Sequence, residues 1–460
     1  MSDAGTVRNG PVHFMGIAGA GMSALAELFI RRGIAVTGCD TTTAATQDLE
    51  RLGIHVMHGH DPDHVEGASE IVVTSAVRRD HPELQRARDL GIAVTRRAEA
   101  LGRAVSIGRL VGIAGTHGKT TTTVMTTQAL ASAGLNPTGI VGGRVGAWNG
   151  NLSSGGENLF VVEADEYDRS FHALSPAVAV VTNMEADHLD IYPGGIDEIR
   201  AAFAQFIRGA ETIVLCADDR GATSIPTPSS SEVIRYGITS DDARLVATGI
   251  DTVGTGSRFD CYYDGKKLGD VILSVPGMHN VRNSLAAIAS GIALGVELEQ
   301  MREGLASFTG VERRFQRIGE AKGVMIIDDY AHHPTEIEAT LEAARAAFPK
   351  QRIIAVFQPH LYSRTRDFFA EFAGALSKAD VIYLSDLYPA REQPIEGVTS
   401  QLIAGKMRDT GKAPEWEGPR SDAARALAPQ VKDGDVVITI GAGDITRTGP
   451  ELLALLQGKE

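Results

Sequence analysis

Short apolar runs recur along the chain, and most of them are followed by glycine or polar residues and then by a helical pattern. In the first hundred residues these runs lie at 12–15, 34–37 and 71–74, and an amphipathic pattern covers 22–32. Short β-branched runs that alternate with helical stretches predict a first unit of the βαβ type.

Two further groups of apolar runs follow. Runs that are apolar at every position are typical of parallel strands buried on both faces of a sheet. The second group predicts such strands at 110–114, 160–162 and 177–181, and the third at 324–327, 352–357, 381–384 and 436–440. The fold class is therefore predicted to be α/β, with three successive α/β domains at 1–106, 107–309 and 310–460.

Residues 226–270 break this pattern. They contain Pro226, Pro228 and a serine run, and polar and apolar residues alternate near 259–263. This pattern predicts loops and antiparallel strands that form a side sheet.

Composition excludes several classes. The 460 residues carry 44 Lys and Arg against 58 Asp and Glu, a net charge of −14, which argues against a general binder of nucleic acid or anionic membranes. Cys39, Cys216 and Cys261 are too far apart for a zinc ribbon or a disulfide framework. No signal peptide precedes the first strand, and the charge-free run 120–143 is interrupted by polar residues, so we expect a soluble cytoplasmic protein without membrane insertion.

The clearest chemical feature is a loop between the strand that ends at Ala114 and a helix predicted over 124–131. Its glycines let backbone N–H groups turn toward phosphate oxygens, Lys119 reaches the β- and γ-phosphates, and the Thr120 hydroxyl is suited to Mg²⁺. The spacing departs from the usual P-loop pattern, because the glycine before Gly118 is Gly115. The loop consists of Gly115, Thr116, His117, Gly118, Lys119, Thr120 and Thr121.

Two acidic clusters follow the next apolar strands. Glu163, Asp165 and Glu166 come after the run 160–162. Glu185, Asp187 and His188 follow the strand that ends at Thr182. Ligands of open α/β sheets bind at the carboxyl ends of the strands, so these groups are expected to meet the phosphate loop there. Carboxylates and one imidazole suit Mg²⁺ or Mn²⁺.

A second glycine loop, residues 16–21, follows the first strand, and Asp40 ends the next strand. It is nearly a dinucleotide-binding fingerprint, but Ala18 takes the place of the middle glycine. By itself the loop indicates a ligand that contains a diphosphate rather than a nicotinamide cofactor.

Polar residues also mark the C-terminal half. Asn280 and Asn283 are three residues apart and would share a helical face. Arg313 and Arg314 lie at the predicted junction with the third domain, where an arginine can reach a nucleotide as domains close. After the next strands come Asp329, Tyr330 and His332, and then Arg364, which is suited to a small carboxylate.

Four histidines, His55, His58, His60 and His64, are spaced like metal ligands. They lie in a polar loop without carboxylate or thiol support in the sequence. A solvated loop is therefore the favoured interpretation.

Seven ordered motifs together resemble the Mur ligases of peptidoglycan synthesis over nearly the whole chain. The motifs are GIAGAGMS at 16–23, GTHGKTTTT at 115–123, EADEYDRSF at 163–171, TNMEADHLD at 182–190, GMHNVRN at 277–283, RRFQ at 313–316 and DDYAHHPTE at 328–336. The resemblance implies a Rossmann-like N-terminal domain for the UDP part of the substrate, a P-loop-type central ATPase domain, and a Rossmann-like C-terminal domain for the amino acid. The implied reaction joins the lactyl carboxylate of UDP-N-acetylmuramate to L-alanine with ATP and Mg²⁺.

The resemblance also assigns roles to residues. Lys119, Glu163, His188 and Arg314 would be catalytic, and Thr120, Glu163 and His188 would hold metal. ATP would bind the loop 115–121 together with Asn280, Asn283, Arg314 and Asp329, and the amino acid would bind Tyr330, His332 and Arg364. The UDP-sugar would bind Gly16, Ala18, Gly19, Gly21, Met22, Ser23, Asp40 and Ser75.

One departure from the family pattern concerns the amino-acid pocket. Leu361 stands where alanine-adding members can carry an arginine, which leaves carboxylate recognition to Arg364 with His332 and Tyr330. The lysine that is carbamylated in several relatives has no counterpart between Glu163 and His188, as in the alanine-adding branch.

Three alternatives stay open at this point. The first is a recycling ligase that attaches an intact tripeptide to UDP-N-acetylmuramate. The second is a nucleotide-dependent oxidoreductase, suggested only by the first glycine loop and Asp40, and the third is a non-catalytic nucleotide sensor. The sequence is compatible with a monomer or a homodimer.

Overall fold

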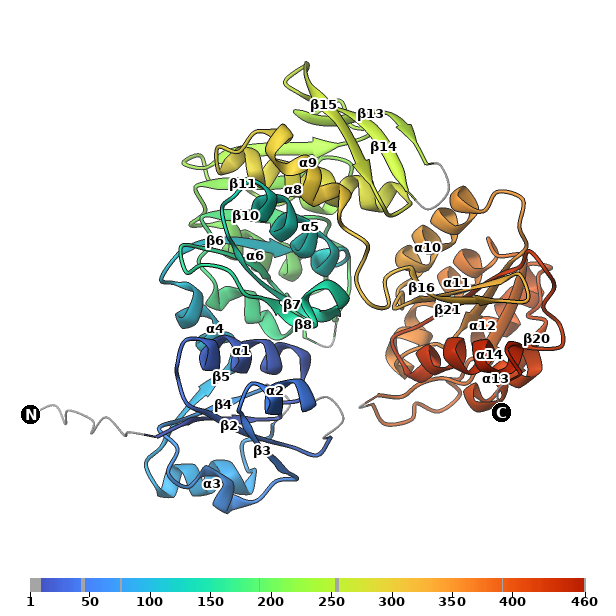
Figure 1. Cartoon of the computed structure of the whole chain (residues 1–460). Coiled ribbons are helices and arrows are strands. Elements are labelled where there is room, and N and C mark those ends of the chain that lie inside the picture. Colours follow the sequence, from blue (N-terminus) through green and yellow to red (C-terminus); the bar gives the residue numbers. More distant parts are fainter. Residues whose placement is uncertain are drawn as a thin grey trace, which may run out of the picture. The chain divides into compact units, whose positions relative to one another are not determined.

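The α/β class predicted from the sequence is confirmed by a computed structural model, which contains three separate sheets (Figure 1). It describes residues 10–42, 46–74, 77–189, 191–252, 256–390 and 392–458. The chain forms two compact units. The first contains the described residues up to 248 together with 260–269 and 282–307, and the second contains 249–259, 270–281 and the residues from 308 onward.

The first sheet is parallel throughout, with the strand order β3-β2-β1-β4-β5. Its strands are β1 (Val12–Met15), β2 (Val36–Asp40), β3 (His55–His58), β4 (Glu70–Val73) and β5 (Ala93–Arg96). The helices between them are α1 (Ala20–Arg31), α2 (Gln47–Arg51), η1 (Pro62–Val65), α3 (Pro82–Asp89) and α4 (Arg97–Val105).

Side chains alternate between the two faces of this sheet, because successive residues of a strand point in opposite directions. Val12 and Phe14 of β1 pack in a core with α1 and α4. Met15 of β1 and Cys39 of β2 pack on the other face, with α3.

The second sheet has ten strands in the order β15-β14-β13-β12-β11-β10-β6-β9-β7-β8. Its strands are β6 (Arg109–Ala114), β7 (Thr138–Val145), β8 (Gly150–Ser153), β9 (Leu159–Glu163), β10 (Val178–Val181), β11 (Thr212–Cys216), β12 (Glu232–Gly237), β13 (Leu245–Asp251), β14 (Ser257–Tyr263) and β15 (Lys266–Leu273). The helices are α5 (Lys119–Ser132), α6 (Ile196–Ile207), α7 (Arg220–Thr223), α8 (Met278–Ala293) and α9 (Leu298–Ala306), with short η2 (Gly146–Trp148) and η3 (Tyr167–Ala173).

The region 226–270 does not form a sheet of its own, because β12 to β15 continue the ten-stranded central sheet. β12 pairs in parallel with β11 and with β13, so the prediction of antiparallel strands was wrong for β12. The alternating pattern noted at 259–263 lies on β14, whose residues do alternate between buried and more exposed positions.

The third sheet has the order β16-β17-β21-β18-β19-β20, and β16 alone among these runs antiparallel to its neighbour. The strands are β16 (Gln316–Ala321), β17 (Val324–Asp329), β18 (Ile353–Phe357), β19 (Val381–Ser385), β20 (Trp416–Gly418) and β21 (Val436–Ile440). The helices are α10 (Pro334–Ala347), α11 (Tyr362–Leu376), α12 (Gln401–Asp409), α13 (Arg420–Leu427), η4 (Asp444–Arg447) and α14 (Thr448–Leu456).

Apolar residues fill both faces of this third sheet. Ile353 and Ala355 of β18 belong to a core with α10 to α12, whereas Ile354 and Val356 pack with α13 and α14. Within the part of the chain that the structure describes, no helix has the length and apolar character needed to span a bilayer.

Candidate functional site

The phosphate loop occupies the position predicted for it, between β6, which ends at Ala114, and α5, which begins at Lys119. Gly115 has φ +140° and Gly118 has φ +82°, two conformations that side chains rarely adopt. Gly118 precedes the first turn of α5, whose free N–H groups are suited to an anion. Thr121 is buried in that turn.

Two residues that sequence reasoning did not single out hold the loop in place. The Asn183 side chain accepts a hydrogen bond from the His117 N–H (2.7 Å) and donates one to the His117 carbonyl (2.9 Å). The Thr182 hydroxyl donates to the same carbonyl at 2.7 Å. Both residues follow β10, which is the neighbour of β6 in the sheet. The sequence alone does not specify this strand order, so it did not predict that these residues reach the loop.

The same part of the loop also contacts Glu185. Its N–H donates to the Thr116 hydroxyl at 2.9 Å, and its carboxylate lies 3.6 Å from His117 Nε2. The segment after β10 therefore supports the loop at both Thr116 and His117.

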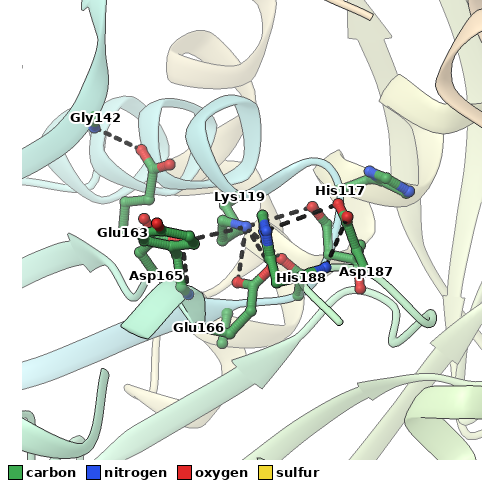
Figure 2. Close-up of polar contacts among 12 residues, drawn as sticks. His117, Lys119, Gly142, Glu163, Asp165, Glu166, Asp187 and His188 are labelled. Atoms are coloured by element: carbon green, nitrogen blue, oxygen red, sulfur yellow. Dashed lines mark hydrogen bonds and ion pairs between the residues drawn. The ribbon is translucent and has the colours of Figure 1, made fainter. Parts of the chain in front are cut away.

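Lys119 lies at the centre of the site (Figure 2). Its ammonium donates to both carboxylate oxygens of Glu166, at 2.8 and 3.0 Å, and to the Gly115 carbonyl at 2.8 Å. Burial by itself would lower the pKa of Lys119, but the charges of Glu166 and Asp165 outweigh it and raise this pKa. Glu166, a member of the first acidic cluster predicted to meet this loop, is almost fully buried.

Glu163 and Thr120 form a second polar contact on the same side of the sheet. The Thr120 hydroxyl lies 3.0 Å from each carboxylate oxygen of Glu163, and the Gly142 N–H donates to Glu163 at 2.7 Å. Burial raises the pKa of Glu163. A cation bound beside this carboxylate would offset the cost of burying its charge, so the pair fits a hard divalent metal ion.

His188 lies near this group but contacts Glu166 rather than Glu163. Its Nε2 is 3.9 Å from Glu166 Oε1 and 3.8 Å from Asp187 Oδ2 (Figure 2). Its ring packs edge-on against Tyr167. Its backbone has φ +54°. The structure thus brings the predicted Lys119, Thr120, Glu163 and His188 into one neighbourhood.

The first glycine loop connects β1 to α1. Gly16 has φ +76°, and its N–H donates to the Cys39 carbonyl at 2.8 Å. The Asp40 carboxylate accepts the Ala18 N–H at 3.0 Å, so it organises the loop itself. The Ser23 hydroxyl donates to the Ala20 carbonyl, and the predicted Ser75 lies outside the described residues.

A cleft of about 280 Å³ joins this loop to the carboxylates of the central sheet. Sequence reasoning missed one of its lining residues, Arg97 at the start of α4, whose guanidinium lies against Gly21. The lining residues include Gly19, Gly21, Met22, Arg97, Glu163 and Asp165.

The two asparagines predicted to share a helical face both lie on α8, which begins at Met278. The Asn280 side chain donates to the Pro276 carbonyl at 2.7 Å, a local contact at the start of the helix. The Asn283 amide lies beside the phosphate loop, where a Cβ on Gly118 would come within 2.8 Å of its Oδ1.

In the second unit, Asp329 ends β17 and is buried. Its two oxygens accept the N–H groups of Phe315 (2.7 Å) and Ala331 (2.8 Å). Burial raises the pKa of Asp329 to about 6, although the Arg314 guanidinium favours the carboxylate. Arg314 lies over the Tyr330 ring and 3.5 Å from Glu336.

The raised pKa of Asp329 predicts that the free energy of unfolding depends on pH. The folded chain holds the Asp329 proton more tightly than the unfolded chain, so the contribution of Asp329 to stability is lost as pH rises from about 4 to about 6. Because asparagine does not titrate, the free energy of unfolding of Asp329→Asn minus that of wild type should increase by about 2–3 kcal/mol over this range. Urea unfolding at a series of pH values measures the difference, and a constant difference would contradict the prediction.

The residues predicted to bind the amino acid follow β17 and β18. His332 Nδ1 contacts the Tyr330 carbonyl at 3.0 Å and Glu336 at 3.2 Å, and the rings of Tyr330 and His332 lie edge to face. Arg364 is buried on α11. Leu361, just before this helix, has φ +72°, an unusual conformation for a branched side chain.

Family models match three consecutive parts of the chain. They are described as "Mur ligase family, catalytic domain" for residues 11–108, "Mur ligase middle domain" for 113–291 and "Mur ligase, glutamate ligase domain" for 313–443. Together they cover most of the sequence and follow the order of the three sheets.

Individual relatives agree with this match. A UDP-N-acetylmuramate–L-alanine ligase from Salinibacter ruber is 44% identical over 452 residues, which cover 97% of this chain and 95% of the relative. The crystal structure of the UDP-N-acetylmuramate-alanine ligase from Thermotoga maritima is 29% identical, with a TM-score of 0.83 over 97% of this chain and 99% of that one. A murein peptide ligase from Psychrobacter arcticus shares the fold, with 23% identity and a TM-score of 0.70 over 97% of this chain and 99% of that one.

Proposed function

The chain belongs to the Mur ligase family, and on that basis we propose that it joins L-alanine to the lactyl carboxylate of UDP-N-acetylmuramate at the expense of ATP. The activity belongs to the synthesis of peptidoglycan precursors. The similarity of the chain to alanine ligases over almost its full length favours L-alanine as the acceptor over the tripeptide of a recycling ligase. An oxidoreductase would leave the organised Lys119 loop unexplained, and the grouping of Lys119, Glu163 and His188 argues against a sensor without catalysis.

The observation that carries the proposal is the cleft that runs from the first glycine loop to Glu163 and Asp165. A sugar nucleotide whose diphosphate lies at the first loop would extend its sugar along this cleft, toward the carboxylates beside Lys119. Arg97 supplies a positive charge for the diphosphate. Residues 1–106 would thus bind the UDP-sugar, 107–309 would bind ATP, and 310–460 would admit the amino acid.

The chemistry follows from the poor reactivity of a carboxylate toward an amine. The lactyl carboxylate attacks the γ-phosphorus of ATP, the bond to the ADP oxygen breaks, and an acyl phosphate forms. The amine of L-alanine then attacks the acyl carbon, and a tetrahedral intermediate collapses to the amide as phosphate leaves. Lys119 stabilises the charge that develops on the transferred phosphoryl group, and no protein nucleophile is needed.

Thr120 and Glu163 would hold one Mg²⁺, and His188 would help to hold a second. When bound, the ion neutralises phosphate charge and aligns the oxygens. Asn280, Asn283, Arg314 and Asp329 would complete the nucleotide site. Tyr330, His332 and Arg364 would receive L-alanine, with Arg364 as the partner of its carboxylate.

Phosphate release tests the proposal directly. The full chain is incubated with ATP, Mg²⁺ and UDP-N-acetylmuramate, with and without L-alanine. Released phosphate is measured, and the mass of the UDP-sugar product is determined by mass spectrometry. We expect phosphate release that requires both co-substrates, with a mass gain of one alanine residue. Turnover with the tripeptide but not with alanine would instead identify a recycling ligase. Absence of phosphate release with both acceptors would refute the ligase assignment.

Glu163 provides a test of the metal assignment. The variant Glu163→Gln keeps the size of the side chain but loses its charge, so the Mg²⁺ concentration for half-maximal activity should rise by at least about tenfold. Glu211→Gln, at an exposed ion pair with Arg109, is the matched control and should leave this concentration unchanged. A lower rate with unaltered Mg²⁺ dependence would mean that Glu163 does not act through the metal.

A further inference from the structure

The face of the first sheet that packs against α3 carries a cluster of potential metal ligands away from the proposed ATP site. In the parallel register of β1 and β2, His13 lies opposite Thr37 and Met15 lies opposite Cys39. Because side chains alternate, His13 and Cys39 point to the same face of the sheet. α3 covers this face and contributes Glu83, so a thiol, an imidazole and a carboxylate are buried together.

The loop after β3 adds two of the four histidines discussed above. His60 Nδ1 lies 3.4 Å from Cys39 Sγ and 3.4 Å from Glu83 Oε2. His64 Nδ1 lies 3.4 Å from Glu83 Oε1. The prediction that these histidines have no thiol or carboxylate beside them was wrong for His60 and His64, whereas His55 and His58 are exposed on β3.

Three of the donor atoms lie as far apart as neighbouring ligands of a tetrahedral metal site. Cys39 Sγ lies 3.4 and 3.5 Å from the two oxygens of Glu83, and 3.4 Å from His60 Nδ1. With metal–sulfur bonds of about 2.3 Å and metal–nitrogen or metal–oxygen bonds of about 2.0–2.1 Å, neighbouring ligand atoms in a tetrahedron lie about 3.3–3.6 Å apart. The Cys39 thiol donates its two contacts to Glu83 as hydrogen bonds, and these contacts hold the three donors at ligand-to-ligand distances.

His13 supplies an independent observation. Its side chain is fully buried, its Nδ1 contacts the Thr37 hydroxyl at 3.0 Å, and its Nε2 has no hydrogen-bond partner among the described residues. The ligand atoms of His13, Cys39 and Glu83 all lie within 4.8 Å of one another. A buried nitrogen without a partner is costly, and a metal ion would satisfy it.

The other ring nitrogen of His13, Nδ1, is held by the Thr37 hydroxyl. Its contact with Thr37 fixes the ring, as second contacts of metal-bound histidines commonly do.

We propose that Cys39, His60, Glu83 and His13 form a binding site for a borderline divalent metal ion of the zinc type. Thiolate and imidazole donors select such ions over Mg²⁺, which prefers oxygen ligands. The site would tie β1, β2 and the loop after β3 to α3. It lies directly behind the first glycine loop, because the Cys39 carbonyl accepts the N–H groups of Gly16 and Ile17.

Co²⁺ is the probe that tests the site, since it replaces zinc and reports a bound thiolate by a charge-transfer band in the near ultraviolet. The full chain is freed of metal with a chelator and titrated with Co²⁺ in excess Mg²⁺, which keeps oxygen-ligand sites filled. We expect the band to saturate at about one Co²⁺ per chain, as for a single four-coordinate site, and to disappear when Zn²⁺ is added. Absence of the band in the wild-type chain would overturn the proposal.

Variants assign the band to residues. Cys39→Ser should abolish it, whereas Cys261→Ser, which removes another buried thiol, should leave it intact. A band that survives Cys39→Ser would also overturn the proposal. His60→Gln should weaken Co²⁺ affinity by at least about tenfold, and His55→Gln, the exposed control on β3, should not. Equal affinity in these two variants would remove His60 from the site, and circular dichroism verifies that each variant is folded.

Discussion

Replacement of Lys119 by methionine is expected to lower the rate of ATP-dependent amide formation by about 10²–10³-fold, the usual loss when one preorganised charge-stabilising donor is removed. Methionine keeps a long apolar stem but has no ammonium group. The rate is measured as phosphate released per chain at saturating UDP-N-acetylmuramate and L-alanine. Binding of UDP-N-acetylmuramate, measured by calorimetry without ATP, should remain within about twofold of wild type because its diphosphate is assigned to the other glycine loop.

The contacts of Lys119 call for one more variant. The ammonium is paired with the buried Glu166, so removing it leaves a buried carboxylate without its cation, which is destabilising in itself. Lys119→Met combined with Glu166→Gln removes both charges and separates the loss of catalysis from the loss of stability. If the double variant regains the wild-type rate, Lys119 serves stability and not phosphoryl transfer.

A surface control completes this experiment. Lys350→Met removes an exposed lysine of the second unit and should leave the rate unchanged. Loss of UDP-N-acetylmuramate binding together with ATP turnover in Lys119→Met would contradict the assignment of the two ligands to different loops.

The parts of the site that lie on single strand–loop–helix segments could be predicted from the sequence. Lys119 and Thr120 follow the apolar run 110–114 and a loop that contains Gly115 and Gly118, and Glu163 follows the next apolar run. Since parallel strands end at the same edge of a sheet, their order along the chain is enough to bring these residues together. The boundaries of β1 and β21 were also predicted correctly, because each is a short, mostly apolar run with clear ends.

The residues that were missed act through contacts between segments whose pairing the sequence does not specify. Asn183 supports His117 only because β10 is the neighbour of β6. Arg97 reaches the first glycine loop from α4, more than seventy residues later in the chain. Glu83 looks like an ordinary residue of the first turn of α3, and only the packing of that helix brings it to Cys39.

Substitution of Gly115 by alanine is expected to reduce ATP turnover by about 10²-fold, because the phosphate loop has no space for a Cβ. A Cβ at this position would lie 2.0 Å from the Thr182 hydroxyl and 3.1 Å from the Asn183 N–H nitrogen. The Thr182 side chain is short and its hydroxyl donates a hydrogen bond to the His117 carbonyl, so it cannot move aside without losing this contact with the loop. The backbone would have to shift, and a displacement of about 1 Å in the positioning of a reacting group costs about this factor.

Gly134 offers a matched control, because it also has a positive φ, +82°, and a Cβ there would meet no atom within 4 Å. Gly134→Ala introduces the strain of a left-handed alanine, about 1–2 kcal/mol, without any collision near the nucleotide. It should therefore lower the apparent melting temperature but keep the affinity for ATP, whereas Gly115→Ala should weaken that affinity even in the folded chain. If both variants lose stability equally and bind ATP equally well, the tight packing of Gly115 against Thr182 has no part in phosphate binding, and the loop owes its shape to Gly118 and the Asn183 contacts alone.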